Sequence, residues 1–183
     1  MQPTKRILIT GGAGFIGSNL TKRLISQGHA VTILDDFSTG LASNISALQV
    51  DVIEGSISST VLIERAAQKA DAIIHLAARG SVPRSLKNPG ATFDVNVQGT
   101  LNVCEVARAK SNPVIFSSSS SVYGANTRDK KVENEWLSPL SPYAASKLSG
   151  EATVVAFSRS FGIQTAVFRL FNVYGPGQRP EHR

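Results

Sequence analysis

The sequence predicts an α/β protein, in which a doubly wound parallel sheet lies between two layers of helices. Two observations predict this fold class. Short apolar runs rich in β-branched residues alternate along the chain with longer segments of helical period. A glycine-rich segment also separates the first apolar run from the first helical segment, as a tight strand-to-helix turn requires.

Six of the apolar runs have the length and composition of buried strands. This number is enough for a complete sheet of the doubly wound class. The predicted strands are Arg6 to Thr10, Ala30 to Asp35, Leu48 to Ile53, Ala72 to Leu76, Pro113 to Ser117 and Gln164 to Arg169.

Three longer segments predict helices. The first is expected to begin near Gly14 and to end at Gly28, whose missing Cβ suits a left-handed C-cap. A second helix is expected near Thr92 to Ala109. The last begins with Ser141 as its N-cap, followed by a proline in its first position, and ends at Gly162.

Length and composition restrict the function classes. The chain has 183 residues, which suits a single domain spanning 1–183. Its 19 basic residues outnumber its 13 acidic residues but are dispersed, so no nucleic-acid interface is expected. One cysteine and three histidines leave little for a metal site, and no metal is expected. No apolar run approaches the roughly 18 residues of a membrane span and no signal peptide is recognisable, so we expect a cytoplasmic protein.

The glycine-rich segment GGAGFIG directly follows the first predicted strand. Gly12, Gly14 and Gly17 fit the pattern GxGxxG, and Gly11, Gly14 and Gly17 fit the variant GxxGxxG. Such glycines permit a tight turn, close approach of the backbone to a pyrophosphate and close packing of the helix on the sheet. The helix N-terminus then offers unpaired N–H groups to the anion. The segment therefore predicts a dinucleotide site.

Asp35 ends the second predicted strand, 18 positions after Gly17. An acidic residue about 20 positions after the glycines accepts hydrogen bonds from the ribose 2′-hydroxyl of NAD. The same charge would repel the 2′-phosphate of NADP. We therefore expect NAD to be the cofactor.

Tyr143 and Lys147 stand four residues apart at the start of the last predicted helix, so both project from one face. A tyrosine that acts as a base near pH 7 needs its pKa lowered by about 3 units, or roughly 4 kcal/mol. Lys147 and an oxidised nicotinamide could together supply the positive charge. The fifth predicted strand runs into the serines Ser117 to Ser121, at the edge where open α/β sheets build their sites.

Several segments together resemble the extended short-chain dehydrogenases/reductases, and within them the NAD-dependent sugar-nucleotide epimerases/dehydratases. They are TGGAGFIG, LDDFSTG, HLAA, NVQGT, SSSSVYG, YAASK and RLFNVYGPGQ. They follow the family's order and intervals from the first strand to the end of the chain. The resemblance implies a Rossmann fold, NAD as the cofactor and a nucleotide sugar as the substrate.

The resemblance also implies roles for individual residues. Ser119, Tyr143 and Lys147 match the catalytic residues of the family, with Ser119 as the hydroxyl that works with the tyrosine. Asn172 would face the nucleotide sugar, and Ser119 would also contact the substrate. Ser81 and Arg84 are further substrate candidates. Their loop is equally expected to be only an exposed basic loop. The implied cofactor contacts are Gly11, Gly14, Phe15, Ile16, Gly17, Asp35, Asp36, Ser38, Thr39, Ser56, Ile57, Leu76, Ala77, Ala78, Asn96, Ser117, Tyr143 and Lys147.

The sequence departs from the family pattern at two places. Ser56 stands where the family usually has an aspartate beside the adenine, which weakens the expected adenine affinity. Ser120 and Ser121 replace the acidic pair of the 4,6-dehydratases, whose elimination of water needs an extra general acid and base. UDP-glucuronate decarboxylases typically keep a glutamate where Ser121 stands. The pattern favours a UDP-hexose 4-epimerase, without separating its glucose, N-acetylhexosamine and glucuronate forms.

Two alternatives stay open: another dehydratase or oxidoreductase of the family, and an NAD-binding module without catalysis. Family members carry a smaller C-terminal lobe that holds the nucleotide sugar, and we expect that lobe to be absent from this chain. The last two predicted helices resemble those that pair as a four-helix bundle in family dimers, so a homodimer is expected. Its apolar surface would comprise Val95, Val103, Val106, Leu148, Val155 and Phe157.

Three further residues are expected to have structural roles. His75, at the end of the fourth predicted strand, is expected to be a packed core histidine. Cys104 is expected to be a small buried apolar side chain. Trp136 is expected to anchor a surface loop.

Overall fold

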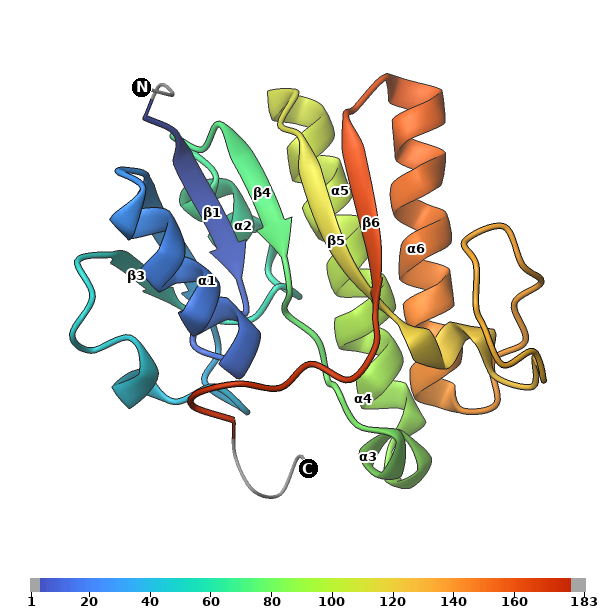
Figure 1. Ribbon diagram of the computed structural model, residues 1–183. Coiled ribbons are helices and arrows are strands. Elements are labelled where there is room, and N and C mark those ends of the chain that lie inside the picture. The colour runs from blue at the N-terminus through green and yellow to red at the C-terminus, as the bar shows by residue number, and fades with distance from the viewer. Residues whose placement is uncertain (1–3, 179–183) are drawn as a thin grey trace.

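The structure, a computed structural model, describes residues 4–178, so residues 1–3 and 179–183 of the expected domain lie outside the described part. A parallel sheet with the strand order β3-β2-β1-β4-β5-β6 forms its centre (Figure 1). Its strands are β1 (Arg6–Thr10), β2 (Ala30–Asp35), β3 (Asp51–Glu54), β4 (Ala72–His75), β5 (Val114–Ser119) and β6 (Thr165–Leu170). The chain adds β2 and β3 on one side of β1 and the later strands on the other, so the direction reverses between β1 and β4. In such sheets, ligands bind at the carboxyl ends of the strands beside this reversal.

The helical segments connect these strands. The α-helices are α1 (Phe15–Ser26), α2 (Thr60–Ala66), α3 (Val82–Lys87), α4 (Pro89–Phe93), α5 (Gly99–Lys110) and α6 (Pro142–Phe161). A π-helical turn, η2 (Asp94–Gln98), joins α4 to α5, and η1 (Ala42–Asn44) and η3 (Ser120–Tyr123) are 3₁₀ turns.

Alternate residues of the central strands face two different helical layers. Leu8 of β1 and Ile73 of β4 belong to the core on the side of α2 and α5. Ile7 and Ile9 of β1 belong to the core on the side of α1. Figure 1 shows α1 in front of the β1 half of the sheet and α5 and α6 behind β5 and β6. The doubly wound, three-layer α/β/α fold is therefore confirmed.

Most predicted elements lie where the sequence placed them, with two informative differences. β3 begins at Asp51 rather than Leu48 because its ladder with β2 starts at the pair Thr32 and Asp51. Leu48 and Val50 instead pack against the core on the α1 side without pairing as strand. The predicted helix near 92–109 starts earlier, at α4, and contains the π-helical turn, in which the N–H of Gly99 donates to the carbonyl of Asp94.

The apolar surface predicted for a dimer is largely part of the protein's own core. Val103 is fully buried and Val106 is buried beside it, and both face the sheet. Val95 and Phe157 pack against the same cluster. Val103 and Val106 are therefore not available for the predicted contact surface, whereas Val95 and Phe157 are only partly buried, and the homodimer itself stays a prediction.

The predictions for the single cysteine and tryptophan have opposite outcomes. Cys104 is buried, and burial raises the pKa of its thiol to about 12. Its prediction as an inert core residue is confirmed. Trp136 is 72% exposed, so its prediction as a loop anchor is wrong.

Candidate functional site

At three glycines of the turn between β1 and α1, the neighbouring atoms leave no space for a Cβ. Gly11 has a φ of +76°, and a Cβ there would lie 2.6 Å from the backbone nitrogen of Ala77. A Cβ on Gly17 would collide with the carbonyl oxygen of Gly11. A Cβ on Gly12 would collide with the side chain of Ile33. The turn is thus packed closely against the loop after β4 and the start of α1, as the spacing of the glycines predicts.

The N-terminus of α1 opens beside this turn. Its N-cap, Gly14, supplies no capping side chain, and the first turn of the helix contains no acidic residue. The first N–H groups of a helix lack intrahelical partners and carry partial positive charge. They therefore offer donors to an anion, and this arrangement fits the diphosphate of a dinucleotide.

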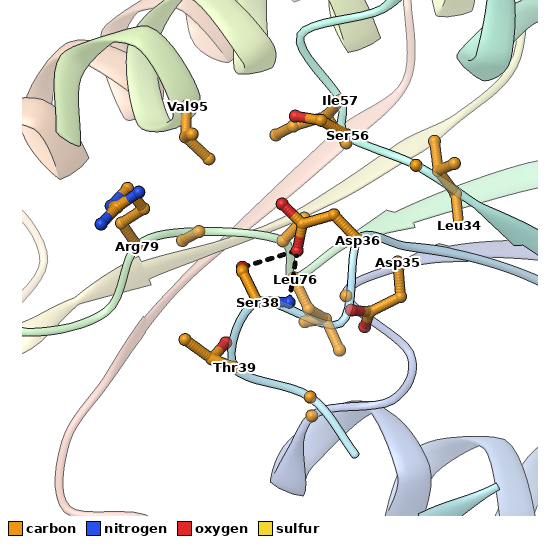
Figure 2. Close-up of a pocket in the computed structure, with 16 residues that line it drawn as sticks. Leu34, Asp35, Asp36, Ser38, Thr39, Ser56, Ile57, Leu76, Arg79 and Val95 are labelled. Carbon is orange, nitrogen blue, oxygen red and sulfur yellow. Dashed lines mark hydrogen bonds between the residues drawn. The ribbon is translucent and has the colours of Figure 1, made fainter. Parts of the chain in front are cut away.

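A cavity lies at the carboxyl ends of β1, β2 and β4 (Figure 2). Of the predicted cofactor contacts it is lined by Gly11, Gly14, Asp35, Asp36, Ser38, Thr39, Ser56, Ile57, Leu76, Ala77 and Ala78. Leu34, Gly40, Gly55, Arg79 and Val95 complete the lining, and sequence reasoning missed them. Figure 2 shows Arg79 and Val95 across the cavity from the aspartates.

The two aspartates of this cavity have different surroundings. Asp35 is buried, and its carboxylate accepts N–H bonds from Ala13 and Phe37, each at 2.9 Å. Burial raises the pKa of Asp35, and the two N–H groups act against that rise. Asp36 is exposed, and one of its oxygens accepts bonds from the N–H and the hydroxyl of Ser38. Asp35 therefore ties the glycine-rich turn to the end of β2, while Asp36 presents its charge at the opening.

A second cavity continues from the first, toward β5. Among the predicted contacts it is lined by Gly11, Gly14, Phe15, Ile16, Gly17, Thr39, Leu76, Ala78, Arg84 and Ser117. Asn44, Gly80, Gly177 and Gln178 also line it and were missed. The last two belong to the segment after β6, which crosses back below the strand ends to α1 (Figure 1). There the side-chain amide of Asn19 donates to the carbonyl of Pro176.

The serine, tyrosine and lysine predicted as catalytic meet beside the second cavity. The Ser119 hydroxyl lowers the pKa of Tyr143, but burial has the larger effect and raises it. The ammonium of Lys147 donates to the carbonyl of Ser117 at 2.8 Å and lies 5.0 Å from the centre of the Phe116 ring. Burial lowers the pKa of Lys147 to about 8.

This geometry differs from the sequence prediction in one respect. The prediction required the pKa of Tyr143 to fall, whereas in the chain alone it is raised. Lys147 is aimed at a backbone oxygen of β5 and is not among the groups that lower the tyrosine's pKa. Lowering that pKa therefore needs a positive charge that the chain does not provide.

Several predicted site residues lie away from both cavities. Ser119, Tyr143, Lys147 and Asn96 line neither one, although Lys147 is bonded to the cavity residue Ser117. Asn96 is buried, accepts a bond from the N–H of Arg79 at 2.7 Å and donates to Ser146 at 2.9 Å. In the chain alone its side chain is a structural bridge, and its role as a cofactor contact stays a prediction.

The substrate candidates also divide. Ser81 is the N-cap of α3, where its hydroxyl accepts the N–H of Arg84, so its side chain already has a structural role. Arg84 lines the second cavity. Asn172 is exposed on the segment that crosses the strand ends. Only Arg84 of these three lines either cavity.

The missed lining residues differ in how much the sequence could reveal. Gly40 and Gly55 follow strand ends, and a Cβ on Gly40 would lie 3.1 Å from Asp35 Oδ1. Such glycines are recognisable as positions of close approach. Arg79 and Val95 are brought together by the packing of η2 over the β4 loop, which no local pattern indicates.

Residues 4–178 contain neither a candidate metal cluster nor a membrane-spanning helix. No cluster of three or more metal-ligating side chains occurs among them. No helix in that range combines the length and hydropathy of a membrane span.

Comparison with known proteins agrees with this geometry. Residues 7–183 match the NAD dependent epimerase/dehydratase family. The chain is 39% identical over 178 residues to a putative UDP-glucose 4-epimerase of Methanocaldococcus jannaschii, covering 96% of this chain and 58% of that protein.

Solved structures show the same likeness. The UDP-glucose 4-epimerase of Thermus thermophilus, solved with NAD, has a TM-score of 0.89 and 35% identity over 96% of this chain and 58% of its own. DesIV, a dTDP-glucose 4,6-dehydratase of Streptomyces venezuelae solved with NAD, has a TM-score of 0.91 and 33% identity, again over 96% and 58%. The chain thus spans 58% of the length of these relatives, and it belongs to the NAD dependent epimerase/dehydratase family.

Proposed function

We propose that this chain forms the NAD-binding and proton-transfer part of a UDP-sugar 4-epimerase. The observation that carries the proposal is the contact between Tyr143 and Ser119, with Lys147 bonded to Ser117 at the edge of a dinucleotide-shaped cavity. The likeness to UDP-glucose 4-epimerases over nearly the whole chain supports the same activity.

The lining of the two adjoining cavities suits the successive parts of NAD in their chemistry. The first offers carboxylates and hydroxyls for an adenosine ribose, from Asp35, Asp36 and Ser38. The glycine-rich turn and the N-terminus of α1 lie between the cavities and suit the diphosphate. The second cavity reaches Ser117 on β5, and this supports a nicotinamide site near the helix that carries Tyr143. Ser56 lines the first cavity and can still donate or accept a hydrogen bond at the adenine.

The proposed reaction begins with removal of a proton from the sugar 4-hydroxyl by ionised Tyr143. Bound NAD would supply the hydride chemistry, accepting hydride from C4 and returning it to the opposite face of the 4-keto sugar. The Ser119 hydroxyl lowers the pKa of the phenol and can stabilise the developing charge. When the sugar is reduced, Tyr143 returns the proton to the oxygen at C4.

The charge balance of the site explains why Tyr143 would not act as a base before the cofactor binds. Burial alone keeps the phenol protonated, because it raises its pKa. Lys147 has a pKa of about 8, so most of it is charged at pH 7, but it is not among the groups that lower the pKa of Tyr143 in the chain alone. The positive charge of an oxidised nicotinamide in the second cavity would therefore have to supply most of the roughly 4 kcal/mol that the tyrosine needs.

A dehydratase is the second candidate, because the likeness to DesIV is as close in structure as that to the epimerases. Elimination of water requires an acid and a base beside the tyrosine. Ser120 and Ser121 occupy the turn η3 that follows Ser119, and neither can act as a carboxylate. This composition favours epimerisation.

Conversion of UDP-galactose to UDP-glucose tests the proposal, in the chain as given and in a version extended to the length of its relatives. Tyr143→Phe should lower turnover at least about 100-fold while NAD remains bound, because only the proton-transferring hydroxyl is lost. Tyr174→Phe is the matched control, since it removes the same hydroxyl from a ring that is 87% exposed. Near-normal turnover by Tyr143→Phe, or no conversion of any UDP-sugar by the extended protein, would refute the proposal.

A further inference from the structure

His75, at the end of β4, is the centre of a line of buried hydrogen bonds that the proposed reaction does not use. Its side chain is buried between two threonines from different elements. Nδ1 lies 2.7 Å from the hydroxyl of Thr10, at the end of β1, and Nε2 lies 3.0 Å from the hydroxyl of Thr100, on α5. Both threonines are also buried. The imidazole therefore connects the strand before the glycine-rich turn with the helix behind the sheet.

The partners of Thr100 fix the direction of the bond to Nε2. The Thr100 hydroxyl donates to the carbonyl of Asn96 at 2.6 Å, and a hydroxyl has one proton to give. It must therefore accept from the imidazole, so Nε2 carries a hydrogen. With the other tautomer, the Thr100 hydroxyl would have to leave the carbonyl, and two acceptor oxygens would face each other.

The partners of Thr10 fix the direction of its bond to Nδ1 of His75. The Thr10 hydroxyl accepts the N–H of Ala77 at 3.4 Å and keeps its own proton for Nδ1. A charged imidazole would bring a second proton to this contact and leave the hydroxyl proton without an acceptor. Burial and the nearby Lys147 also lower the pKa of His75 to about 3, in agreement with a neutral ring.

Asn96 links this line to the helix that carries the tyrosine. Its carbonyl accepts from Thr100, while its side chain accepts the N–H of Arg79 and donates to Ser146. The Ser146 hydroxyl in turn donates to the carbonyl of Tyr143 at 2.8 Å. Asn96 lies within the π-helical turn η2, and such turns recur where a helix is deformed to place a functional group.

The two ends of this network are the two halves of the proposed site. Ala77 and Arg79 line the first cavity, on the loop after β4. Ser146 and the backbone of Tyr143 belong to the first turns of α6. Each hydrogen in the network has one acceptor, so the network defines a single arrangement of the loop relative to the helix.

We propose that His75 is a positioning residue: as a neutral imidazole protonated at Nε2, it holds the cofactor loop at Ala77 and Arg79 in register with the helix of Tyr143 through Thr100 and Asn96. The importance of that register rests on the proposed function, but the network itself can be tested without it.

Nitrogen-15 NMR of the imidazole in the chain as given tests the protonation state directly. We expect a pyrrole-type signal at Nε2 and a pyridine-type signal at Nδ1, unchanged between about pH 5 and 8 because the ring does not titrate there. A hydrogen on Nδ1, or titration of the ring in this interval, would overturn the proposal.

A matched pair of substitutions tests the positioning role. Glutamine can place its amide nitrogen where Nε2 lies, and asparagine can place its amide oxygen where Nδ1 lies. His75→Gln should therefore keep the bond to Thr100, whereas His75→Asn should lose it. Thr100→Val removes the same bond without touching the histidine, and it remains informative if His75→Asn does not fold.

Hydrogen exchange of two backbone amides provides a readout that general destabilisation would not produce. The N–H of Arg79 belongs to the network, whereas the N–H of Ala13, bonded to Asp35, lies outside it. In His75→Asn and Thr100→Val, exchange of the Arg79 amide should accelerate at least about tenfold relative to that of Ala13, and His75→Gln should restore it. Equal acceleration of both amides in all variants would reduce His75 to a core residue and overturn the proposal.

The kinetic consequence separates this proposal from the proposed function. In an extended, active protein saturated with NAD, His75→Asn and Thr100→Val should lower kcat at least about tenfold with the KM for the UDP-sugar within about twofold, because the cofactor loop loses its register with the helix of Tyr143. An unchanged kcat would overturn the positioning role. Inactivity of the unaltered protein would instead count against the epimerase proposal and leave the exchange and NMR results standing.

Discussion

The glycine-rich turn and the start of α6 lie on opposite sides of the same site and are held in place by different interactions. The turn is held by backbone atoms in contact, as at Gly11 and Gly17, where any side chain would collide with main chain. The start of α6 is held by buried polar side chains, among them Lys147 and Ser146. The first region is fixed by shape, and the second by protonation states and hydrogen bonds.

This difference determines how each region responds to change. Contacts between backbone atoms tolerate no added atom and do not titrate, so the pH dependence of the turn is limited to the Asp35 carboxylate that accepts the N–H of Ala13. A buried polar cluster tolerates substitution by side chains of similar shape, but its stability depends on the charge of each side chain in it. We therefore expect substitutions to be most severe in the turn, and pH effects to arise in the α6 region.

The largest effect is expected in the turn. Gly17→Val should abolish NAD binding and lower the free energy of unfolding by at least about 3 kcal/mol, because the Cβ and its methyl groups meet the backbone of Gly11 and Gly12. Gly90→Ala is the control, since its Cβ would meet only the side chain of Asn88 at an ordinary 3.7 Å. Calorimetric NAD titration and chemical denaturation of both variants check this. Normal NAD binding by Gly17→Val would contradict the role of the turn.

The next largest effect is expected at the buried ion pair between Glu151 of α6 and Arg169 of β6. Glu151 accepts three bonds from Arg169 and one from Ser118, and both members of the ion pair are largely buried. Glu151→Gln should destabilise the fold by about 3 kcal/mol, because it leaves the guanidinium without its counter-charge. The control is Glu105→Gln, whose partner Arg108 is exposed, and it should cost less than about 1 kcal/mol. Equal losses in the two variants would show that burial of the Glu151 pair is irrelevant.

The contrast between the two regions also explains what the sequence could predict. The turn was recognisable because its requirement is local: glycines at fixed spacing between a strand and a helix. Asp35 was recognisable for the same reason, although its bonds to Ala13 and Phe37 became visible only in the fold. The boundaries of α6 agreed because Ser141 and Gly162 act within one turn of the helix ends.

The α6 region was predicted in composition but not in its electrostatics. The sequence placed Tyr143 and Lys147 on one helix face, yet the raised pKa of the tyrosine follows from burial by segments distant in the chain. The π-helical turn at Asn96 and the cavity residue Arg79 were missed for the same reason. Val103 and Val106 are buried against the sheet rather than available to a partner, because helical period shows that they share a face but not whether that face meets the sheet.

A pH effect should separate the two regions most cleanly. The pKa of Lys147 is about 8 in the folded chain and 10.5 as an ordinary lysine. Between these values the unfolded chain binds more protons than the folded chain, so stability should rise with pH, by up to about 1.4 kcal/mol per unit. Below pH 8 both states are protonated and the destabilisation is complete.

Lys147→Met should remove this slope, because no group then titrates at that position. Denaturation midpoints of both proteins between about pH 8 and 9.5 check the prediction. The buried Cys104 thiol lowers the stability of both proteins equally as pH rises through this interval, so the difference between the two profiles isolates Lys147. Lys22→Met, on the exposed side of α1, is the control and should retain the slope. Parallel pH profiles for the Lys147→Met variant and the unaltered chain would contradict the burial of a titrating lysine.

The glycine-rich turn and the two aspartates are expected to form an NAD site, and calorimetric titration of the chain with NAD and with NADP tests this expectation. The chain as given should bind NAD and should bind NADP at least about tenfold more weakly, because Asp35 and Asp36 oppose a 2′-phosphate at the ribose end of the cavity. Asp35→Asn should narrow that difference. NADP binding as tight as that of NAD, or no binding of either cofactor, would contradict this expectation.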